Sequence, residues 1–350
     1  MTSGQRKLRA GVVGLGMMGR NHARVYDELA DEVDLIAVAD PDAAAVRRST
    51  AGRAARGYAD AATMFAEEEL DLVSVASPTS LHLPVVLDAL AASVNVLVEK
   101  PIAGERDEAE RMIAAARDAG KLLTVGHIER FNPAVRELHR RLQAGELGRL
   151  FQVKATRLGP FPARIRDVGV VVDLAPHDLD IMRYVIGSDP IRLYAETERR
   201  IHTDHEDLFN GIMKFANGVV GVLDINWLTP TKRRTLTVTG ERGMYVVDYI
   251  NQDLIYYANS EAVHTWENRG SLDAPPVTSV AEGEMARRAV RRQEPLAVEL
   301  SEFARAVREG GPSPVDPHDA LVALLLSKKM VEAGETGAVI GGAELAEALA

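Results

Sequence analysis

The segment Leu8–Gly19 (LRAGVVGLGMMG) decides the fold of the first half of this 350-residue chain. Its first six residues predict a β-strand, a glycine turn follows, and a helix is expected to continue to about Leu29. The turn has the G-x-G-x-x-G spacing, whose glycines permit a tight turn, close approach of a pyrophosphate and close packing of helix on strand. Free N–H groups at the helix start attract phosphates. Five residues are therefore predicted to bind a dinucleotide: Gly14, Gly16, Met17, Met18 and Gly19.

Asp40 follows the second predicted strand, Leu35–Ala39. An acid at this position can accept hydrogen bonds from the adenine-side ribose hydroxyls of a dinucleotide. Because it would also repel a 2′-phosphate, the sequence favours NAD over NADP. A second interpretation makes Asp40 the N-cap of the next helix, with Pro41 at its first position. The two roles are compatible.

The tripeptide Glu99-Lys100-Pro101 follows an apolar run, Val94–Val98, that predicts a buried strand. Glu and Lys are rarely buried unless they are paired. Here both are expected at the carboxyl end of a parallel strand, where open α/β sheets bind their ligands, and Pro101 ends the strand. A lysine at that place can polarise a substrate hydroxyl beside a bound cofactor. The alternative is a surface turn with an ion pair.

Strands and helices alternate through the first 125 residues. Further strands are expected at Leu72–Ala76 and Leu122–Val125, and helices at Leu83–Ala91 and Glu105–Ala119. This alternation predicts a parallel sheet with helices on both faces.

The pattern changes near His127. Helices are expected over about 134–144 and 317–333, the latter packing back onto the core, and Asn217-Gly218 is a hairpin signal. Strand-like runs between the helices predict a mostly antiparallel sheet: 150–156, 191–197, 211–215, 219–226, 234–239 and 244–249. The expected fold is therefore α/β, with domains over 1–127 and 128–350.

The composition is that expected of a soluble enzyme. Hydrophobic residues make up 46% of the chain, and no apolar run approaches the roughly 20 residues that cross a bilayer. The polar start Met1–Lys7 does not resemble a signal peptide, so we expect a cytoplasmic protein. The net charge of −10 argues against nucleic-acid binding. One basic run is expected to be a solvated helix face or a subunit contact: Arg287, Arg288, Arg291 and Arg292.

Two kinds of site are not expected. The chain has no cysteine, which excludes disulfides, thiolate catalysis and zinc–cysteine sites. No metal site is predicted either, because His82, His127 and His177 are not at a compact ligand spacing.

A second group of reactive side chains lies in the segment 169–180. A helix is predicted from Asp173 onward, since Pro176 is tolerated in a first turn. Asp173 and His177 are four residues apart and so share one helix face. His is suited to proton transfer near neutral pH, and Asp173 can orient Lys100 or His177. The alternative is a capping Asp and a surface His.

The chain resembles the Gfo/Idh/MocA family of oxidoreductases over essentially its whole length. The resemblance rests on three motifs in the expected order and separation: the Gly14–Gly19 turn, Glu99–Pro101 and the Asp173…His177 pair. The resemblance implies an N-terminal Rossmann domain that binds NAD and a C-terminal α+β domain. The latter carries a large, mostly antiparallel open sheet with substrate contacts and oligomer interfaces, so a homodimer or homotetramer is expected. The resemblance assigns catalysis to Lys100, Asp173 and His177. It also implies residues beside the nicotinamide or its ribose: Ser77, Thr79, His82, Glu99 and Lys100.

Two blocks, Arg157–Gly169 and Asp224–Lys232, resemble the UDP-N-acetylglucosamine 3-dehydrogenases within that family. Such enzymes oxidise the sugar C3 hydroxyl so that an aminotransferase can install an amine, which makes an aminotransferase an expected pathway partner. Arg164 and Arg166 precede the predicted catalytic helix, and Arg binds phosphate oxygens in bidentate fashion. They are predicted to bind the substrate pyrophosphate, along with Asp173 and His177 at the sugar. The alternative is that these arginines pair with local acids such as Asp167. Trp227, in the second block, is expected to lie in the core.

The resulting hypothesis is an NAD-dependent oxidation of a sugar secondary hydroxyl, in its specific form C3 of UDP-N-acetylglucosamine. His177 would act as general base, and Lys100, oriented by Asp173, would stabilise the developing alkoxide, although their roles can be exchanged. Two alternatives stay open. One is a dehydrogenase of a free sugar or inositol, and the other is a non-catalytic NAD-binding sensor.

Overall fold

The computed structural model describes residues 6–162, 168–201, 204–259 and 283–349. It forms two compact units, one of Met1–Phe131 with Gln293–Leu325 and the other of Asn132–Arg292 with Leu326–Ala350. The expected division at 127/128 assigned the whole C-terminal part to one domain, except for a helix packing back. In the structure a longer segment, Gln293–Leu325, returns to the first unit.

The first unit contains a six-stranded parallel sheet in the order β3-β2-β1-β4-β5-β6. Its strands are β1 Leu8–Val13, β2 Val33–Ala39, β3 Arg56–Tyr58, β4 Leu72–Val75, β5 Asn95–Glu99 and β6 Leu123–Gly126. The strand order reverses between β1 and β4, and ligands of such sheets bind at the carboxyl ends of the strands beside this switch. The predicted parallel sheet is confirmed.

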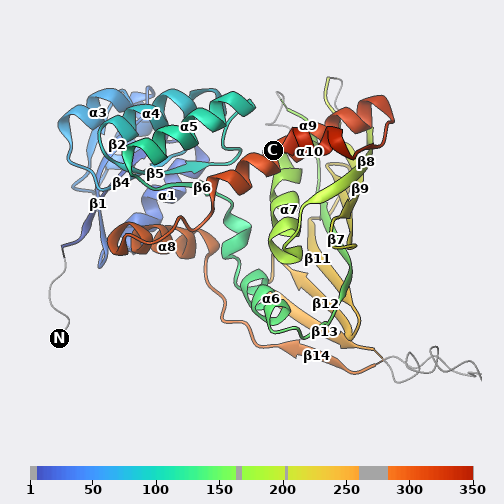
Figure 1. Cartoon of the computed structure of the whole chain (residues 1–350). Coiled ribbons are helices and arrows are strands. Elements are labelled where there is room, and N and C mark those ends of the chain that lie inside the picture. The colour runs from blue at the N-terminus through green and yellow to red at the C-terminus, as the bar shows by residue number, and fades with distance from the viewer. Residues whose placement is uncertain (1–5, 163–167, 202–203, 260–282, 350) are drawn as a thin grey trace, which may run out of the picture. The chain divides into compact units, whose positions relative to one another are not determined.

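Helices cover both faces of this sheet (Figure 1). Helices α3, α4 and α5 lie on one face, and α1 and α8 lie on the other. Their bounds, with that of α2, are α1 Met17–Glu28, α2 Ala43–Thr50, α3 Ala61–Glu67, α4 His82–Ala91, α5 Arg106–Ala119 and α8 Pro295–Glu309. Short 3₁₀ turns occur at η1 Thr79–Leu81 and η2 Ile128–Phe131. The core beneath α1 and α8 joins Val12, Tyr26 and Leu97 to Leu300 and Phe303, so α8 is an integral part of the unit.

The second unit contains a nine-stranded sheet in the order β14-β13-β12-β11-β7-β10-β9-β8-β15. The strands are β7 Leu150–Leu158, β8 Pro190–Glu198, β9 Leu208–Phe215, β10 Val220–Asn226, β11 Arg233–Gly240, β12 Gly243–Asp248, β13 Asp253–Ala258, β14 Met285–Arg288 and β15 Ile340–Gly341. Of the described pairings, β7 with β10 is parallel and the rest are antiparallel. The predicted hairpin is confirmed: β9 and β10 pair across Asn217-Gly218, and Gly218 has a φ of 89°.

The second unit has helices α6 Pro133–Gln143, α7 Val170–Ile186 and α10 Ala343–Leu349, and α9 Pro317–Thr336 passes from the first unit into it. Among the described residues, no helix is both long and apolar enough to cross a bilayer. Helix α7 packs against β7, β9 and β10.

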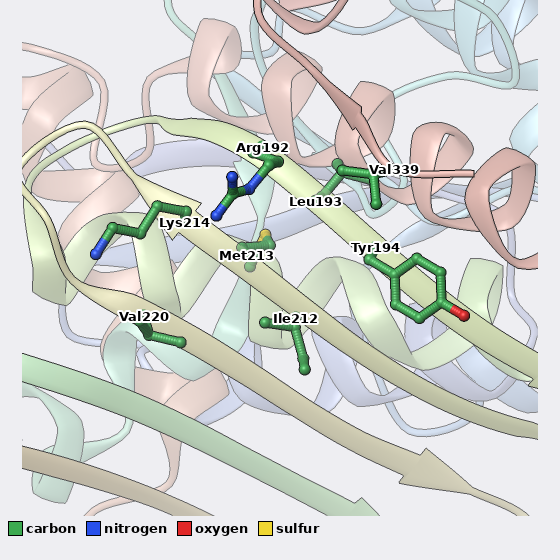
Figure 2. Close-up of a pocket in the computed structure, with 8 residues that line it drawn as sticks. All are labelled: Arg192, Leu193, Tyr194, Ile212, Met213, Lys214, Val220 and Val339. Carbon is green, nitrogen blue, oxygen red and sulfur yellow. The ribbon is translucent and has the colours of Figure 1, made fainter. Parts of the chain in front are cut away.

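Buried and partly exposed residues alternate along β9 and β10. The buried side chains lie on one face of the sheet, and the partly exposed ones lie on the opposite face. Figure 2 shows a pocket on β8–β10, with Arg192, Tyr194, Ile212 and Lys214 among its lining residues. Ile212 is 53% exposed, and Val339, which lines the same pocket, is 61% exposed. This face therefore combines apolar and basic groups.

The basic run of the sequence does not form a helix face, contrary to one expectation. Arg287 and Arg288 lie in β14, at the edge of the sheet. Asp253 accepts hydrogen bonds from Arg287 at 2.5 Å and from Arg292 at 3.1 Å, and the Arg288 guanidinium lies over the ring of Tyr256. Local partners in β13 thus hold three of these arginines.

A buried ion pair joins α7 to the sheet. Arg157 of β7 donates two hydrogen bonds to Asp178 of α7, at 2.6 and 3.1 Å, and both side chains are 3% exposed or less. The Arg157 guanidinium also lies 5.5 Å from the ring centroid of Tyr249. Removing one partner of such a pair leaves an uncompensated buried charge.

We therefore expect Arg157→Met to lower the free energy of unfolding of the second unit by about 3–5 kcal/mol, because Asp178 then loses its partner. Trp227 is buried in this unit, so urea unfolding followed by tryptophan fluorescence reports it. The control is Arg200→Met, which removes the exposed Arg200–Glu198 pair and should cost about 0–1 kcal/mol. Equal losses in the two variants would contradict the assignment.

Candidate active site

The glycine turn of the first unit has the shape that a dinucleotide requires. Gly14 has a φ of 84°, and a Cβ on it would lie 2.5 Å from the backbone N of Ser77. A Cβ on Gly19 would lie 1.7 Å from the carbonyl oxygen of Gly14. A Cβ on Gly16, by contrast, would meet no atom within 4 Å. The first and third glycines thus permit close packing, and the second faces open space at the start of α1, where a pyrophosphate can approach.

Asp40 is fixed beside this turn. Its carboxylate accepts hydrogen bonds from the backbone N–H of Leu15 at 2.6 Å and of Asp42 at 2.7 Å, and the side chain stays partly exposed. The N-cap of α2 is Asp42, whose carboxylate accepts from the N–H of Ala44 at 2.8 Å. The interpretation of Asp40 as the helix N-cap is therefore wrong. The position next to the glycine turn fits an acceptor for ribose hydroxyls.

His82 joins the loops that follow β4 and β5. It is 1% exposed, and its Nε2 lies 3.0 Å from the carbonyl oxygen of Ser77. Its Nδ1 lies 3.1 Å from the carbonyl oxygens of both Pro101 and Ile102. Burial lowers the pKa of His82, and the carbonyl oxygens oppose that shift. His82 thus braces two segments predicted to line the nicotinamide site, while direct contact of Ser77, Thr79 and His82 with the cofactor stays a prediction.

Glu99 is held at the carboxyl end of β5 by a residue that the sequence analysis missed. His22 of α1 is fully buried, and its Nε2 lies 2.9 Å from Oε1 of Glu99. The other carboxylate oxygen accepts from the backbone N–H of Lys100 at 3.2 Å. Burial acts to raise the pKa of Glu99, but the hydrogen bond and charge of His22 and the charge of Lys100 outweigh it, so this pKa lies below its ordinary value. Glu99 is therefore a buried, charged anchor at the start of the turn, whereas Lys100 and Pro101 are half-buried. The turn is not the surface ion pair considered as an alternative.

A signal for His22 does exist in the sequence. It lies three residues after Gly19, on the face of α1 that also buries Ala23 and Tyr26. A histidine in an otherwise apolar stripe, one turn after a dinucleotide motif, points to a partner at the end of a neighbouring strand.

The second group of predicted residues lies on α7, which begins earlier than expected. The helix starts at Val170 rather than Asp173, so Pro176 lies inside it rather than in the first turn. Glu206 explains the early start: its carbonyl oxygen accepts from Val170 N–H at 2.9 Å, and its carboxylate accepts from Val171 N–H at 3.1 Å. These bonds satisfy donors that a helix start leaves unpaired. A remote residue therefore positions the helix that carries Asp173 and His177.

Asp173 and His177 share a face of α7 and are both partly exposed. Asp173 also lines a pocket of the second unit that contains Trp227 and the basic residues Arg157, Lys232 and Arg234. Arg157 and Arg234 are directly opposite each other on β7 and β11. Trp227 is 4% exposed, and its ring meets the edge of Phe161 at a centroid distance of 6.0 Å, in keeping with its expected core position. Arg164 and Arg166 lie outside the described residues.

Both parts of the chain match known protein families. Residues 8–127 match the oxidoreductase family with an NAD-binding Rossmann fold, and residues 135–246 match the GFO/IDH/MocA C-terminal domain. The UDP-N-acetylglucosamine 3-dehydrogenase of Acidithiobacillus ferrooxidans is 30% identical over 86% of this chain and 88% of its own length. The chain belongs to the Gfo/Idh/MocA oxidoreductase family.

A solved structure of UDP-N-acetylglucosamine 3-dehydrogenase GnnA from A. ferrooxidans is similar to the chain at a TM-score of 0.82 and 27% identity, covering 95% of this chain and 99% of that one. Inositol 2-dehydrogenase 4 of Saccharopolyspora erythraea is 33% identical over 53% of this chain and 55% of its own length. The predicted family, fold class and NAD cofactor are confirmed. The protein is an NAD-dependent oxidoreductase acting on CH–OH groups, as are its relatives.

We expect Asp40→Ala to weaken NAD binding about tenfold, because a hydrogen bond to a charged group contributes about 1.5 kcal/mol or more. NADP binding should weaken less, since a charge that repels the 2′-phosphate is also removed. Titration calorimetry with each cofactor measures both effects. The control is Asp42→Ala, which removes the N-cap of α2 two residues away and should leave the ratio of the two affinities unchanged. An unchanged ratio in Asp40→Ala would contradict the ribose role.

Proposed function

We propose that this protein oxidises the C3 hydroxyl of UDP-N-acetylglucosamine to the 3-keto sugar, with NAD as the hydride acceptor. The observation that carries the general reaction is Lys100 beside the buried Glu99–His22 pair, at the carboxyl end of β5 in an NAD-binding unit. The specific substrate is supported by similarity to the UDP-N-acetylglucosamine 3-dehydrogenase of A. ferrooxidans over most of both chains.

Oxidation of the hydroxyl needs one group that accepts its proton and one cationic group that stabilises the developing alkoxide. Bound NAD would supply the hydride acceptor for the sugar carbon. The glycine turn and Asp40 bind the cofactor, and Glu99 and His22 hold the start of the Lys100 segment. His177 takes the hydroxyl proton as general base, while the Lys100 ammonium stabilises the developing alkoxide and Asp173 orients it. The hydroxyl thus loses one proton to the protein and its carbon loses one hydride.

Recognition of a nucleotide sugar draws support from the Asp173 pocket. Lys232 and Arg234 line it together with Trp227, and cationic side chains of this kind suit phosphate oxygens. Arg164 and Arg166 are proposed to bind the same pyrophosphate.

A second candidate is a dehydrogenase of a free sugar or inositol. The similarity to inositol 2-dehydrogenase 4 of S. erythraea favours it, although that similarity covers about half of each chain. A non-catalytic NAD-binding sensor is the least favoured candidate, because Lys100, Asp173 and His177 are all present.

We further propose that a second copy of the chain covers the outer face of β8–β10 in a homodimer or homotetramer. The exposed apolar side chains of this face, Ile212 and Val339, support the proposal. A cytoplasmic location and an aminotransferase that consumes the 3-keto product remain proposals as well.

The deciding experiment follows reduced-nicotinamide absorbance with NAD and UDP-N-acetylglucosamine, with an aminotransferase and glutamate present to remove the ketone. Parallel reactions contain free N-acetylglucosamine or myo-inositol. We expect turnover only with the nucleotide sugar. Turnover of a free sugar or inositol without benefit from the uridine diphosphate would replace the proposal by the second candidate. Absence of turnover with all three compounds, with NAD shown to bind, would return the substrate to the wider pool of sugars and polyols.

Lys100→Met should lower kcat by about 100-fold or more and leave NAD affinity nearly intact, because the lysine charge acts on the developing alkoxide. The matched control is Lys121→Met, which removes a partly exposed lysine outside the predicted site and should leave kcat unchanged. Steady-state kinetics and NAD titration of the two variants measure the effect. Normal turnover by Lys100→Met would remove Lys100 from the mechanism.

A further inference from the structure

His22 is a polar side chain in an otherwise apolar part of the first unit. It lies on α1, is 0% exposed, and shares its buried face with Ala23 and Tyr26. Burying an imidazole is unfavourable unless it is hydrogen-bonded. Within the part of the chain that the structure describes, its Nδ1 has no hydrogen-bond partner, whereas its Nε2 lies 2.9 Å from Oε1 of Glu99. The contact with Glu99 is therefore the interaction that offsets the burial of His22.

The Glu99 carboxylate is confined on three sides. Its Oε1 meets His22, and its Oε2 accepts a hydrogen bond from the backbone N–H of Lys100 at 3.2 Å. Gly126 of β6 pairs with Glu99 in the sheet, and a Cβ there would lie between 3.1 and 3.3 Å from the carboxylate atoms. The carboxylate thus lies against the bare Cα of Gly126. Because both oxygens are engaged and the sheet closes the third side, the orientation of this carboxylate is fixed.

The direction of these hydrogen bonds follows from the chemistry of the groups. An ionised carboxylate only accepts, so Nε2 of His22 and the backbone N of Lys100 are both donors to Glu99. Hydrogen bonds to an ionised acceptor are about twice as strong as those between neutral groups. A buried carboxylate that loses one of two donors gains from taking up a proton or from turning toward another donor. Either change disturbs the bond to the Lys100 N–H, so His22 and Lys100 are linked through Glu99.

Helix α1 connects this contact to the cofactor turn. Its start, at Gly16 and Met17, is where a pyrophosphate can approach, and His22 follows in the same helix. Since the turns of a helix move together, the hydrogen bond from His22 to Glu99 fixes the carboxyl end of β5 relative to the helix that holds the cofactor. Hydride transfer depends on such alignment, because misplacement of a group by about 1 Å can lower a rate about 100-fold.

We propose that His22 is a positioning residue for Lys100: acting through Glu99, it fixes the Lys100 backbone relative to α1, the helix at which the cofactor phosphates bind. This role rests on the proposed function, in which the Lys100 ammonium stabilises the developing alkoxide. His22 touches neither substrate nor cofactor in it. Loss of His22 should therefore slow the chemical step and leave the binding of NAD and of the sugar largely unchanged.

The first test compares His22→Leu with His22→Gln by steady-state kinetics and NAD titration, on the substrate that the deciding experiment identifies. Leucine fills the space without a donor, so kcat should fall about tenfold or more, as for the loss of a hydrogen bond to a charged group. The NAD dissociation constant and the sugar KM should stay within about threefold, since the lost interaction acts on the transition state. The amide N–H of glutamine can reach the same carboxylate, so His22→Gln should recover most of kcat.

The matched control is Tyr26→Phe. Tyr26 lies one turn after His22 on the same buried face, and its hydroxyl shares a hydrogen bond of 2.8 Å with Ser74. This variant removes a buried hydrogen bond of the same helix but not the one to Glu99, so the urea midpoint should fall and kcat should not. An equal loss of kcat in Tyr26→Phe, or a loss in His22→Leu that appears in NAD affinity alone, would reduce His22 to a structural role and overturn the proposal.

A double substitution asks whether His22 acts through Glu99. Glu99→Gln keeps an acceptor for His22 but lacks a second one for the Lys100 N–H, so the link is already broken in this variant. We expect Glu99→Gln to lower kcat and His22→Leu to lower it little further, whereas additive losses would overturn the proposal. The same pair replaces the single variant should His22→Leu fail to fold, because the double variant buries no unpaired charge.

Hydrogen exchange of the Lys100 amide tests the link without a substrate. Because Pro101 has no N–H, short overlapping peptides separate the exchange of Lys100 from that of the residues after it. The amide should exchange faster in His22→Leu than in the wild type, His22→Gln and Tyr26→Phe. Equal rates in His22→Leu and the wild type would overturn the proposal. If no sugar is oxidised, the proposed function fails, while faster exchange in His22→Leu still supports the link from His22 to Lys100, so the two failures are distinguishable.

Discussion

The close approach of Gly19 to the carbonyl oxygen of Gly14 is the constraint on which the first unit depends. Any Cβ at position 19 would lie 1.7 Å from that oxygen, so only glycine lets α1 lie this near the end of β1. With α1 held there, one buried face carries His22 to the Glu99 carboxylate and Tyr26 to Ser74. The same helix supplies the surface on which α8 packs. The cofactor turn and the anchor of Lys100 are therefore consequences of one steric contact.

In the second unit, charged side chains rather than close backbone packing hold the helix that carries predicted site residues. Helix α7 is fixed at its start by Glu206, and further along by the buried pair of Asp178 with Arg157. Asp173 lies between these two restraints. A carboxylate that is to orient another group needs a rigid helix beneath it, and Pro176 inside the helix removes one backbone donor that would otherwise stiffen it. The two ion-based restraints offset that loss.

Most elements with a periodic sequence pattern could be predicted, whereas elements that depend on contacts between residues far apart in the chain could not. Alternating apolar runs and the glycine turn were sufficient to predict the parallel sheet, and the hairpin at Asn217-Gly218 followed from its turn residues. Strand β3 was missed because three residues carry no period. Helix α8 was missed as part of the first unit because its packing partners lie about 200 to 290 positions earlier in the chain. The start of α7 was misplaced for the same reason, since its stabilising contact comes from Glu206, 35 residues away along the chain from Val171.

In the candidate site, too, residues in short motifs could be predicted, whereas contacts between distant parts of the chain could not. Lys100, Asp173 and His177 belong to motifs with recognisable spacing, whereas the pairing of His22 with Glu99 and the burial of Glu299 become clear only from the folded structure. A leucine at position 299 would continue the apolar face of α8 and would avoid the cost of burying a carboxyl group. Local stability therefore argues against an acid at this position. Where a sequence departs from the local rule inside a well-packed core, the compensating gain is to be sought in function.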